Sequence, residues 1–256
     1  MRIRIKEGND ENGRRIMIIT VTNQKGGVGK TMLACHLAWR ASEDRTCLAI
    51  DLDTQANLTQ TLLGRTVGIE GDAALVFGEG TLVPLSVSER LSLLPGGAAL
   101  KEIDEGVELR NAIDRRERIE SLADVIVIDT PPAIGVRQVA PYFWSDILVL
   151  VLTPDVFSLK GMADVRNTLD RVRTRNPDLL LRVVMNRHHP EAPREREVVD
   201  LIEREFRGDL IRPVLAESRT VSGAVSERVS AWDYTYKSPA RAKAMRAVCE
   251  AILNKV

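Results

Sequence analysis

Residues 23–31 read NQKGGVGKT and lie between an apolar run, residues 16–21, and a helical pattern that begins near Thr31. The glycines of this loop let the backbone curl so that successive N–H groups point at an anion, and the helix adds its positive N-terminal end. The pattern predicts a phosphate-binding loop made by Gly26, Gly27, Val28 and Gly29. Lys30 would reach the β- and γ-phosphates of a nucleotide, and the Thr31 hydroxyl would bind magnesium.

The loop departs from the plain P-loop pattern at one position. Gln24 stands where that pattern has glycine, and it is followed by a second lysine, Lys25. The resulting KGGVGKT resembles the deviant Walker A motif of the ParA/MinD group of ATPases. In that group the extra lysine crosses a dimer interface to the partner's nucleotide, so the resemblance implies a catalytic role for Lys25. The alternative is a glycine-rich turn with an exposed lysine.

A second set of polar residues follows the strand expected at residues 46–50. Asp51 and Asp53 belong to the segment DLDTQAN, residues 51–57. Carboxylates at the end of a strand in an open α/β sheet lie beside the ligand crevice, where they can orient water or hydrated magnesium. The segment resembles the ParA signature D-L-D-P-Q-x-N, with Thr54 in place of proline. The resemblance implies that Asp53 positions the attacking water and that Asp51 lies near the metal; helix capping is the alternative for either residue alone.

A third element comes from the apolar strand expected at residues 124–129. It ends in Asp129, the Walker B arrangement, in which the carboxylate would hold magnesium through water. The sequence DTPP, residues 129–132, resembles the second switch of the ParA/MinD group, a segment that senses the γ-phosphate. The three motifs occur in the chain order of that group.

Two later residues are candidates for binding the adenine base. Asn186 ends the strand expected at residues 180–185, and relatives use an Asn there to contact the adenine edge, which suits a side chain with both a donor and an acceptor. Pro213 lies in a segment that resembles the part of the family fold covering the base. A capping Asn and a simple loop proline are the alternatives.

The C-terminal part of the chain is locally basic, although the whole chain has 36 Lys+Arg and 36 Asp+Glu. ParA dimers bind DNA without sequence preference through basic residues in this region, and clustered Lys and Arg give salt-sensitive phosphate contacts without base readout. A solvated helix face is the alternative for each residue. The candidates are Arg219, Arg228, Lys237, Arg241, Lys243 and Arg246.

Composition and length limit the classes that remain. A chain of 256 residues with 44% hydrophobic content can build one large α/β domain, here expected over residues 16–256 after a flexible polar arm, residues 1–15. Three scattered cysteines fit neither a disulfide framework nor a zinc site and suit a reducing cytoplasm. No apolar run approaches the roughly 20 residues that span a bilayer. A charged helix is expected over residues 106–122.

These features together predict a mostly parallel sheet with helices on both faces, a P-loop ATPase fold of the deviant Walker A type. The resemblance implies a ParA-type partition ATPase, cytoplasmic and associated with the nucleoid. ATP and Mg²⁺ would bind between the two subunits of a homodimer, and this dimer would bind double-stranded DNA. A ParB-like partner would stimulate ATP hydrolysis and so release the dimer from the DNA. The alternatives are a MinD-like or other cargo-positioning ATPase acting on a membrane or a protein assembly, and a metabolic ATP-dependent ligase. An iron–sulfur carrier would need cysteines that the loops near Asp129 lack.

Overall fold

The computed structural model describes residues 16–64, 72–155 and 167–254, so the arm predicted at residues 1–15 lies outside the described residues. The described residues form a seven-stranded sheet in the order β3-β4-β2-β5-β1-β6-β7. All neighbouring strands are parallel except β3 and β4. The predicted mostly parallel sheet is therefore confirmed. Its strands are β1 (Met17–Thr22), β2 (Cys47–Asp51), β3 (Leu85–Ser86), β4 (Leu91–Leu94), β5 (Val125–Asp129), β6 (Ile147–Leu152) and β7 (Leu180–Met185).

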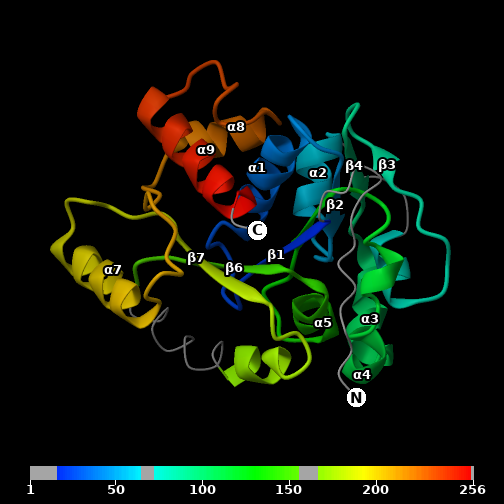
Figure 1. The fold of residues 1–256 in the computed structure, drawn as a ribbon. Helices are drawn as coiled ribbons and strands as arrows, with labels where there is room; N and C mark the ends of the chain where they lie inside the picture. The colour runs from blue at the N-terminus through cyan, green and yellow to red at the C-terminus, as the bar shows by residue number, and fades with distance from the viewer. Residues whose placement is uncertain (1–15, 65–71, 156–166, 255–256) are drawn as a thin grey trace.

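Helices cover both faces of the sheet (Figure 1). One face carries α1 (Lys30–Ser42), α2 (Asn57–Leu63), α8 (Arg219–Ser226) and α9 (Pro239–Leu253). The other carries α3 (Lys101–Gly106), α4 (Leu109–Ala112) and α5 (Val136–Trp144), while α7 (Pro193–Glu205) lies on the side of β7. The helix after the phosphate loop, α1, is packed against α9.

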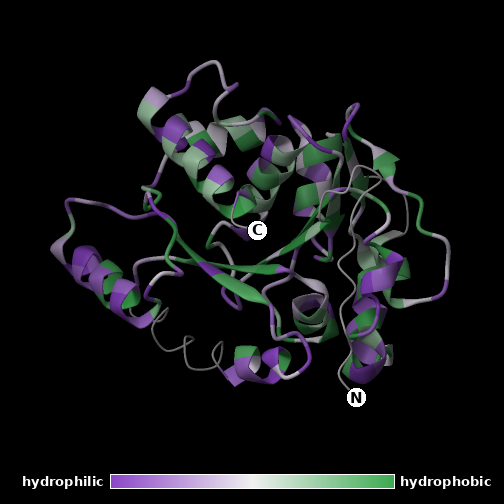
Figure 2. Ribbon diagram, in the orientation of Figure 1, coloured by the Kyte–Doolittle hydropathy of each residue, from purple (hydrophilic) through white to green (hydrophobic). Residues whose placement is uncertain are grey.

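The strands are buried on both faces because their sequences are apolar at almost every position. In β1, Ile19 joins the core under α1, α8 and α9, whereas its neighbour Ile18 joins the core under α5. A third cluster of apolar residues joins β6 and β7 to α7. Figure 2 shows the strands as the most hydrophobic part of the ribbon, with hydrophilic residues along the outer sides of the helices.

The helix predicted over residues 106–122 is wrong. The chain there is broken into the end of α3 at Gly106, the single turn α4 and a 3-10 turn at Arg116–Arg118. Val107 is extended, and the indole Nε1 of Trp144 donates to the carbonyl of Ala112 at 2.9 Å. That carbonyl would otherwise accept the next helical N–H, so tertiary contacts with α5 interrupt the helix here.

The sheet brings three of the predicted motifs together at the carboxyl ends of its strands. β1 ends at the phosphate loop, β2 ends at Asp51 and β5 ends at Asp129. Asp51 and Asp129 are paired in the parallel register of β2 and β5. Within the described part of the chain, none of the helices is both long and apolar enough to cross a bilayer.

Candidate functional site

The phosphate loop has the backbone that its glycines predict. Gly27 and Gly29 have φ of 74° and 102°, in the left-handed region that favours glycine, and the carbonyl of Gly29 accepts the first helical bond from Leu33 at 3.0 Å. Lys30 is 7% exposed, and its Nζ donates to the carbonyl of Lys25 at 3.2 Å. Burial lowers the pKa of Lys30, while the charges of Asp129 and Asp53 oppose that shift. The ammonium therefore lies inside the loop and within the field of two carboxylates.

Asp129 lies at the floor of this loop. Its Oδ2 accepts a hydrogen bond from the Thr31 hydroxyl at 2.6 Å, whereas its buried Oδ1 has no partner among the described residues. Burial, and then the charge of Asp51, raise the pKa of Asp129 to about 8, although the Thr31 bond lowers it. An unpartnered buried carboxylate oxygen beside a threonine hydroxyl is an arrangement that a hard cation such as Mg²⁺ would complete.

Asp51 organises the loop that carries Asp53. Its Oδ2 accepts from the amide of Thr59 at 2.9 Å and from the Thr59 hydroxyl at 2.8 Å, while its Oδ1 accepts from the amide of Asp53 at 3.1 Å. Burial raises the pKa of Asp51 to about 6 despite these bonds. Asp53 in turn accepts from the amide of Gln55 at 3.0 Å. A role of Asp51 near a metal and the water-positioning role of Asp53 stay predictions.

Lys25 lies on the rim of the loop. Its side chain is about half exposed, and its Nζ forms an ion pair of 2.7 Å with Asp155. Its backbone amide donates to the Asn23 side chain at 2.7 Å. The lysine to which the resemblance gives a role at a partner's nucleotide is thus at the surface and paired within its own chain. A surface ion pair of this kind contributes little stability.

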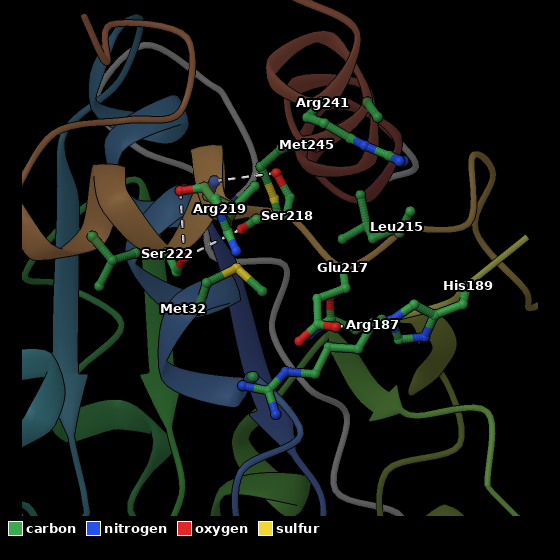
Figure 3. A pocket seen from close by; sticks show the side chains of 16 residues that line it. Met32, Arg187, His189, Leu215, Glu217, Ser218, Arg219, Ser222, Arg241 and Met245 are labelled. Carbon is green, nitrogen blue, oxygen red and sulfur yellow. Dashed lines mark hydrogen bonds and ion pairs between the residues drawn. The ribbon is translucent and has the colours of Figure 1, made fainter. Parts of the chain in front are cut away.

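A cavity of about 630 Å³ opens beside the phosphate loop (Figure 3). Asn186 lines it together with residues of α1, α8 and α9. The amide nitrogen of Asn186 donates to the carbonyl of Val28 at 2.7 Å, which ties the end of β7 to the phosphate loop. Pro213 does not line this cavity; it is exposed, and the chain enters the cavity two residues later, at Leu215. The amide of Leu215 donates to the carbonyl of Met185 at the end of β7. This bond brings the chain to the cavity at Leu215, after Pro213.

The predicted DNA-binding residues occupy three different settings. Arg219 and Arg241 line the cavity beside Asn186 (Figure 3). Arg246 is held by Glu43 at 2.6 Å and by Glu250 at 3.0 Å, with its guanidinium over the Trp232 ring. Arg228, Lys237 and Lys243 are exposed. The six side chains do not form one uniform surface.

Sequence reasoning missed several residues that the structure brings to this site. Arg187 lines both the cavity beside Asn186 and a smaller one of about 330 Å³ beside Lys25, and it has a positive φ of 57°, which is uncommon for arginine. Gly96 packs where a Cβ would lie 2.7 Å from the carbonyl of Asp53. The side chain of Arg137 bonds to the carbonyl of Leu52 at 3.1 Å. The only signal for Arg187 was its place next to Asn186; Gly96 and Arg137 carried none, because their contacts lie far away in sequence.

A family model described as "AAA domain" matches residues 16–181. Protein IncC of Escherichia coli is 28% identical over 264 residues, which cover 96% of this chain and 72% of that protein. The chromosome partitioning protein ParA of Caulobacter vibrioides is 29% identical over 226 residues, which cover 82% of this chain and 84% of that protein.

Three solved structures share the fold. McdA of Cyanothece has a TM-score of 0.82 at 18% identity, with 93% of this chain and 100% of that chain covered. A putative plasmid partition protein of Borrelia burgdorferi bound to AMPPNP has a TM-score of 0.78 at 20% identity, with coverage of 94% and 100%. A cobyrinic acid a,c-diamide synthase of Mycobacterium smegmatis with ADP and magnesium has a TM-score of 0.76 at 21% identity, with coverage of 93% and 94%.

Proposed function

The chain belongs to the AAA domain family and is a P-loop ATPase of the ParA/MinD partition type, and from this premise we propose that it is a DNA-segregation switch. In its ATP-bound state two copies associate and bind double-stranded DNA without sequence preference. A ParB-like partner stimulates hydrolysis and so releases the DNA. The observation that carries the proposal is the pair Thr31–Asp129 at 2.6 Å, with a buried and unpartnered Oδ1, directly under a glycine loop.

The residues present fit ATP and Mg²⁺. Backbone N–H groups of residues 26–31 would surround the phosphates, and Lys30 would balance their negative charge. Thr31 and Asp129 would hold the cation, whose positive charge stabilises negative charge on the transferred phosphoryl group. The Asn186 amide already donates to Val28, so its oxygen is the group that would accept from the adenine amino group.

The chain's own residues supply the remaining steps. The Asp53 carboxylate would orient the attacking water, because the bond from its amide to Asp51 and the bond it accepts from Gln55 fix the turn that carries it. Lys25 would leave Asp155 and contact the phosphates of the partner's nucleotide. An exposed ion pair with Asp155 is weak enough to be exchanged for a phosphate, which makes the dimer dependent on nucleotide.

The proposal is tested by binding to random-sequence duplex DNA with ATP, with ADP and without nucleotide, at two salt concentrations. We expect binding in ATP alone, weakened at the higher salt and weakened again by Lys25→Ala. Lys101→Ala removes another exposed lysine, on α3, and serves as the matched control with wild-type binding. Absence of DNA binding in every nucleotide state would overturn the partition function, and equal effects of the two lysine variants would overturn the role of Lys25.

A second candidate function is the positioning of a protein cargo by the same ATPase cycle. The likeness of the fold to that of McdA, at a TM-score of 0.82, supports this second function. Where DNA binding is found, the partner that stimulates hydrolysis separates the two functions. Stimulation of ATP hydrolysis by a DNA-bound centromere protein supports partition, whereas stimulation by a protein assembly without DNA specificity supports cargo positioning.

A further inference from the structure

Arg137 lies in the first turn of α5, a few residues after the DTPP segment. Although it carries a charge, it is only 7% exposed. A buried guanidinium costs free energy unless its donors are satisfied, and here they are satisfied by groups from two other parts of the chain. Those groups belong to α3 and to the loop that carries Asp53.

The first contact joins α5 to α3. The Nε of Arg137 donates to Asp104 Oδ2 at 2.8 Å, and its Nη2 lies 2.7 Å from the same oxygen. The other oxygen of Asp104 accepts from the backbone amide of Arg137 at 3.1 Å, so one carboxylate both pairs with the side chain and satisfies the start of α5. A Cβ at Gly135 would lie 2.6 Å from Asp104 Oδ1, so glycine permits this close approach.

The second contact reaches the loop between Asp51 and Asp53. Nη1 of Arg137 donates to the carbonyl of Leu52 at 3.1 Å. The backbone amide of Leu52 donates to the carbonyl of Asp129 at 3.0 Å. Leu52 is therefore held on one side by the end of β5 and on the other by the helix that follows it, and Asp53 is the next residue.

From these contacts we propose that Arg137 is a positioning residue for ATP hydrolysis. Through Leu52 it sets the placement of Asp53, and through its own helix it links that placement to the DTPP segment. Asp104 holds the guanidinium in the required orientation. Movement of either segment then moves the other, so the two parts of the site change together. The inference rests on the proposed ATPase function and adds a residue to it that touches neither nucleotide nor metal.

A buried ion pair with a purely structural role is the competing explanation, and the chain offers a matched control for it. Arg116 is likewise largely buried and bonds to Asp146 at 3.1 Å, to Glu120 at 3.1 Å and to the carbonyl of Trp144 at 2.5 Å. Asp146 lies just before β6, and it accepts a hydrogen bond from the amide of Ile18 near the start of β1. This cluster therefore lies at the amino ends of the strands, opposite the end that carries the phosphate loop. Arg116→Met removes a comparable clamp away from the site.

The experiment compares wild type, Arg137→Met, Arg137→Lys, Asp104→Asn and Arg116→Met in the full-length chain. The affinity for Mg·ATP is measured at equilibrium, and the hydrolysis rate is measured at saturating ATP. We expect Arg137→Met and Asp104→Asn to lower the hydrolysis rate at least tenfold while the affinity changes less than threefold. Arg137→Lys should recover part of the rate, because an ammonium can contact Asp104 but lacks the fork that also reaches Leu52. Arg116→Met should keep the rate within twofold even where its melting temperature falls.

Amide hydrogen exchange of residues 52–56 supplies a readout that needs no hydrolysis. It should rise at least tenfold in Arg137→Met and stay unchanged in Arg116→Met. If Arg137→Met does not fold, Arg137→Lys and Asp104→Asn carry both measurements. Equal hydrolysis rates and equal exchange in the Arg137 and Arg116 variants would overturn the positioning role. A wild-type chain that hydrolyses no ATP would instead overturn the proposed function, and the exchange data would then still decide whether Arg137 orders the loop.

Discussion

Asn186 approaches the phosphate loop at a point where only glycine leaves room for it. A Cβ added at Gly29 would collide with the Asn186 amide nitrogen and would lie 3.1 Å from the end of Met32. The Asn186 amide uses this space to bond to the carbonyl of Val28 at 2.7 Å. Gly29 therefore meets two requirements at once, a φ of 102° and a close contact between the loop and β7.

We predict that Gly29→Ala destabilises the fold by about 1–3 kcal/mol, since alanine is strained at this φ. ATP affinity should fall at least tenfold, because the displaced Asn186 no longer holds Val28 against β7. Urea unfolding and equilibrium binding of Mg·ATP measure the two effects. Gly106→Ala is the matched control: Gly106 ends α3 outside the phosphate loop, a Cβ there meets nothing within 4 Å, and its φ is not positive. Equal losses in the two variants would contradict the explanation.

At the scale of elements, a buried histidine fastens α1 to the segment that follows α8. The Nδ1 of His36 bonds to the carbonyl of Met32 at 2.7 Å, and its Nε2 accepts from the amide of Ala231 at 3.2 Å. Its ring also packs edge-on against Trp39 and Trp232. Accepting a hydrogen bond at Nε2 requires the neutral ring, and burial lowers the pKa of His36 to about 4.

This pKa predicts the sign of a pH effect on stability. Between about pH 4 and 6.5 the unfolded chain binds a proton at His36 that the folded chain does not, so the contribution of His36 to the free energy of unfolding falls as the pH falls through this window. The raised pKa values of Asp51 and Asp129 act in the opposite direction, so the effect of His36 is read from the difference between wild type and a His36 variant. The full loss below the window is roughly 3 kcal/mol. Urea unfolding of wild type and His36→Gln from pH 4.5 to 7 measures it, and the difference in free energy of unfolding between the two should shift against wild type as the pH falls.

His189→Gln is the control with the opposite sign. Hydrogen bonds to Glu217 and then Glu195 raise the pKa of the exposed His189, so its contribution to stability is present at low pH and is lost as the pH rises. The difference in free energy of unfolding between wild type and His189→Gln should therefore shift in favour of wild type as the pH falls. If the free energy of unfolding of His36→Gln depended on pH as in wild type, the predicted contribution of the buried His36 ring would be contradicted.

Most strands and the start of α1 could be predicted from the sequence because their signals are local. The run at residues 16–21, which ends at a glycine loop, predicted each end of β1 to within one residue, and β7 was predicted with the bounds that the structure has. The wrong helix over residues 106–122 has the opposite cause. Its charges suit a helix, yet the Trp144 side chain takes the Ala112 carbonyl from a distant part of the chain.

The site divides in the same way. Four predicted residues lie at or just beyond the carboxyl ends of parallel strands, and these ends meet on one side of the sheet. The structure accordingly brings together Lys30, Thr31, Asp51 and Asp129. Arg137, Gly96 and Arg187 act through contacts that depend on how separate elements pack. Pro213 was assigned by resemblance in a region without a periodic pattern, and the cavity is reached two residues beyond it.

For the whole molecule, the balance of charge matters less than its distribution. The chain has equal numbers of basic and acidic residues, so DNA binding depends on which cations are available at the surface. Arg246 is paired with Glu43 and Glu250 and packs on Trp232. Lys243 is exposed without an ion pair among the described residues, and Lys237 is exposed and bonds only to the carbonyl of Trp232.

We therefore predict that Lys237→Ala combined with Lys243→Ala weakens ATP-dependent DNA binding and makes it less sensitive to salt. Each lost phosphate contact lowers the slope of log K against log salt by about 0.9, so the double variant should lower it by nearly 2. Arg246→Ala should instead lower the melting temperature and leave the slope unchanged, because its charge is already balanced by two carboxylates. Binding isotherms on random-sequence duplex at four salt concentrations measure the slopes. A reduced slope for Arg246→Ala with none for the lysines would place the DNA around Arg246, Trp232 and Glu43 instead.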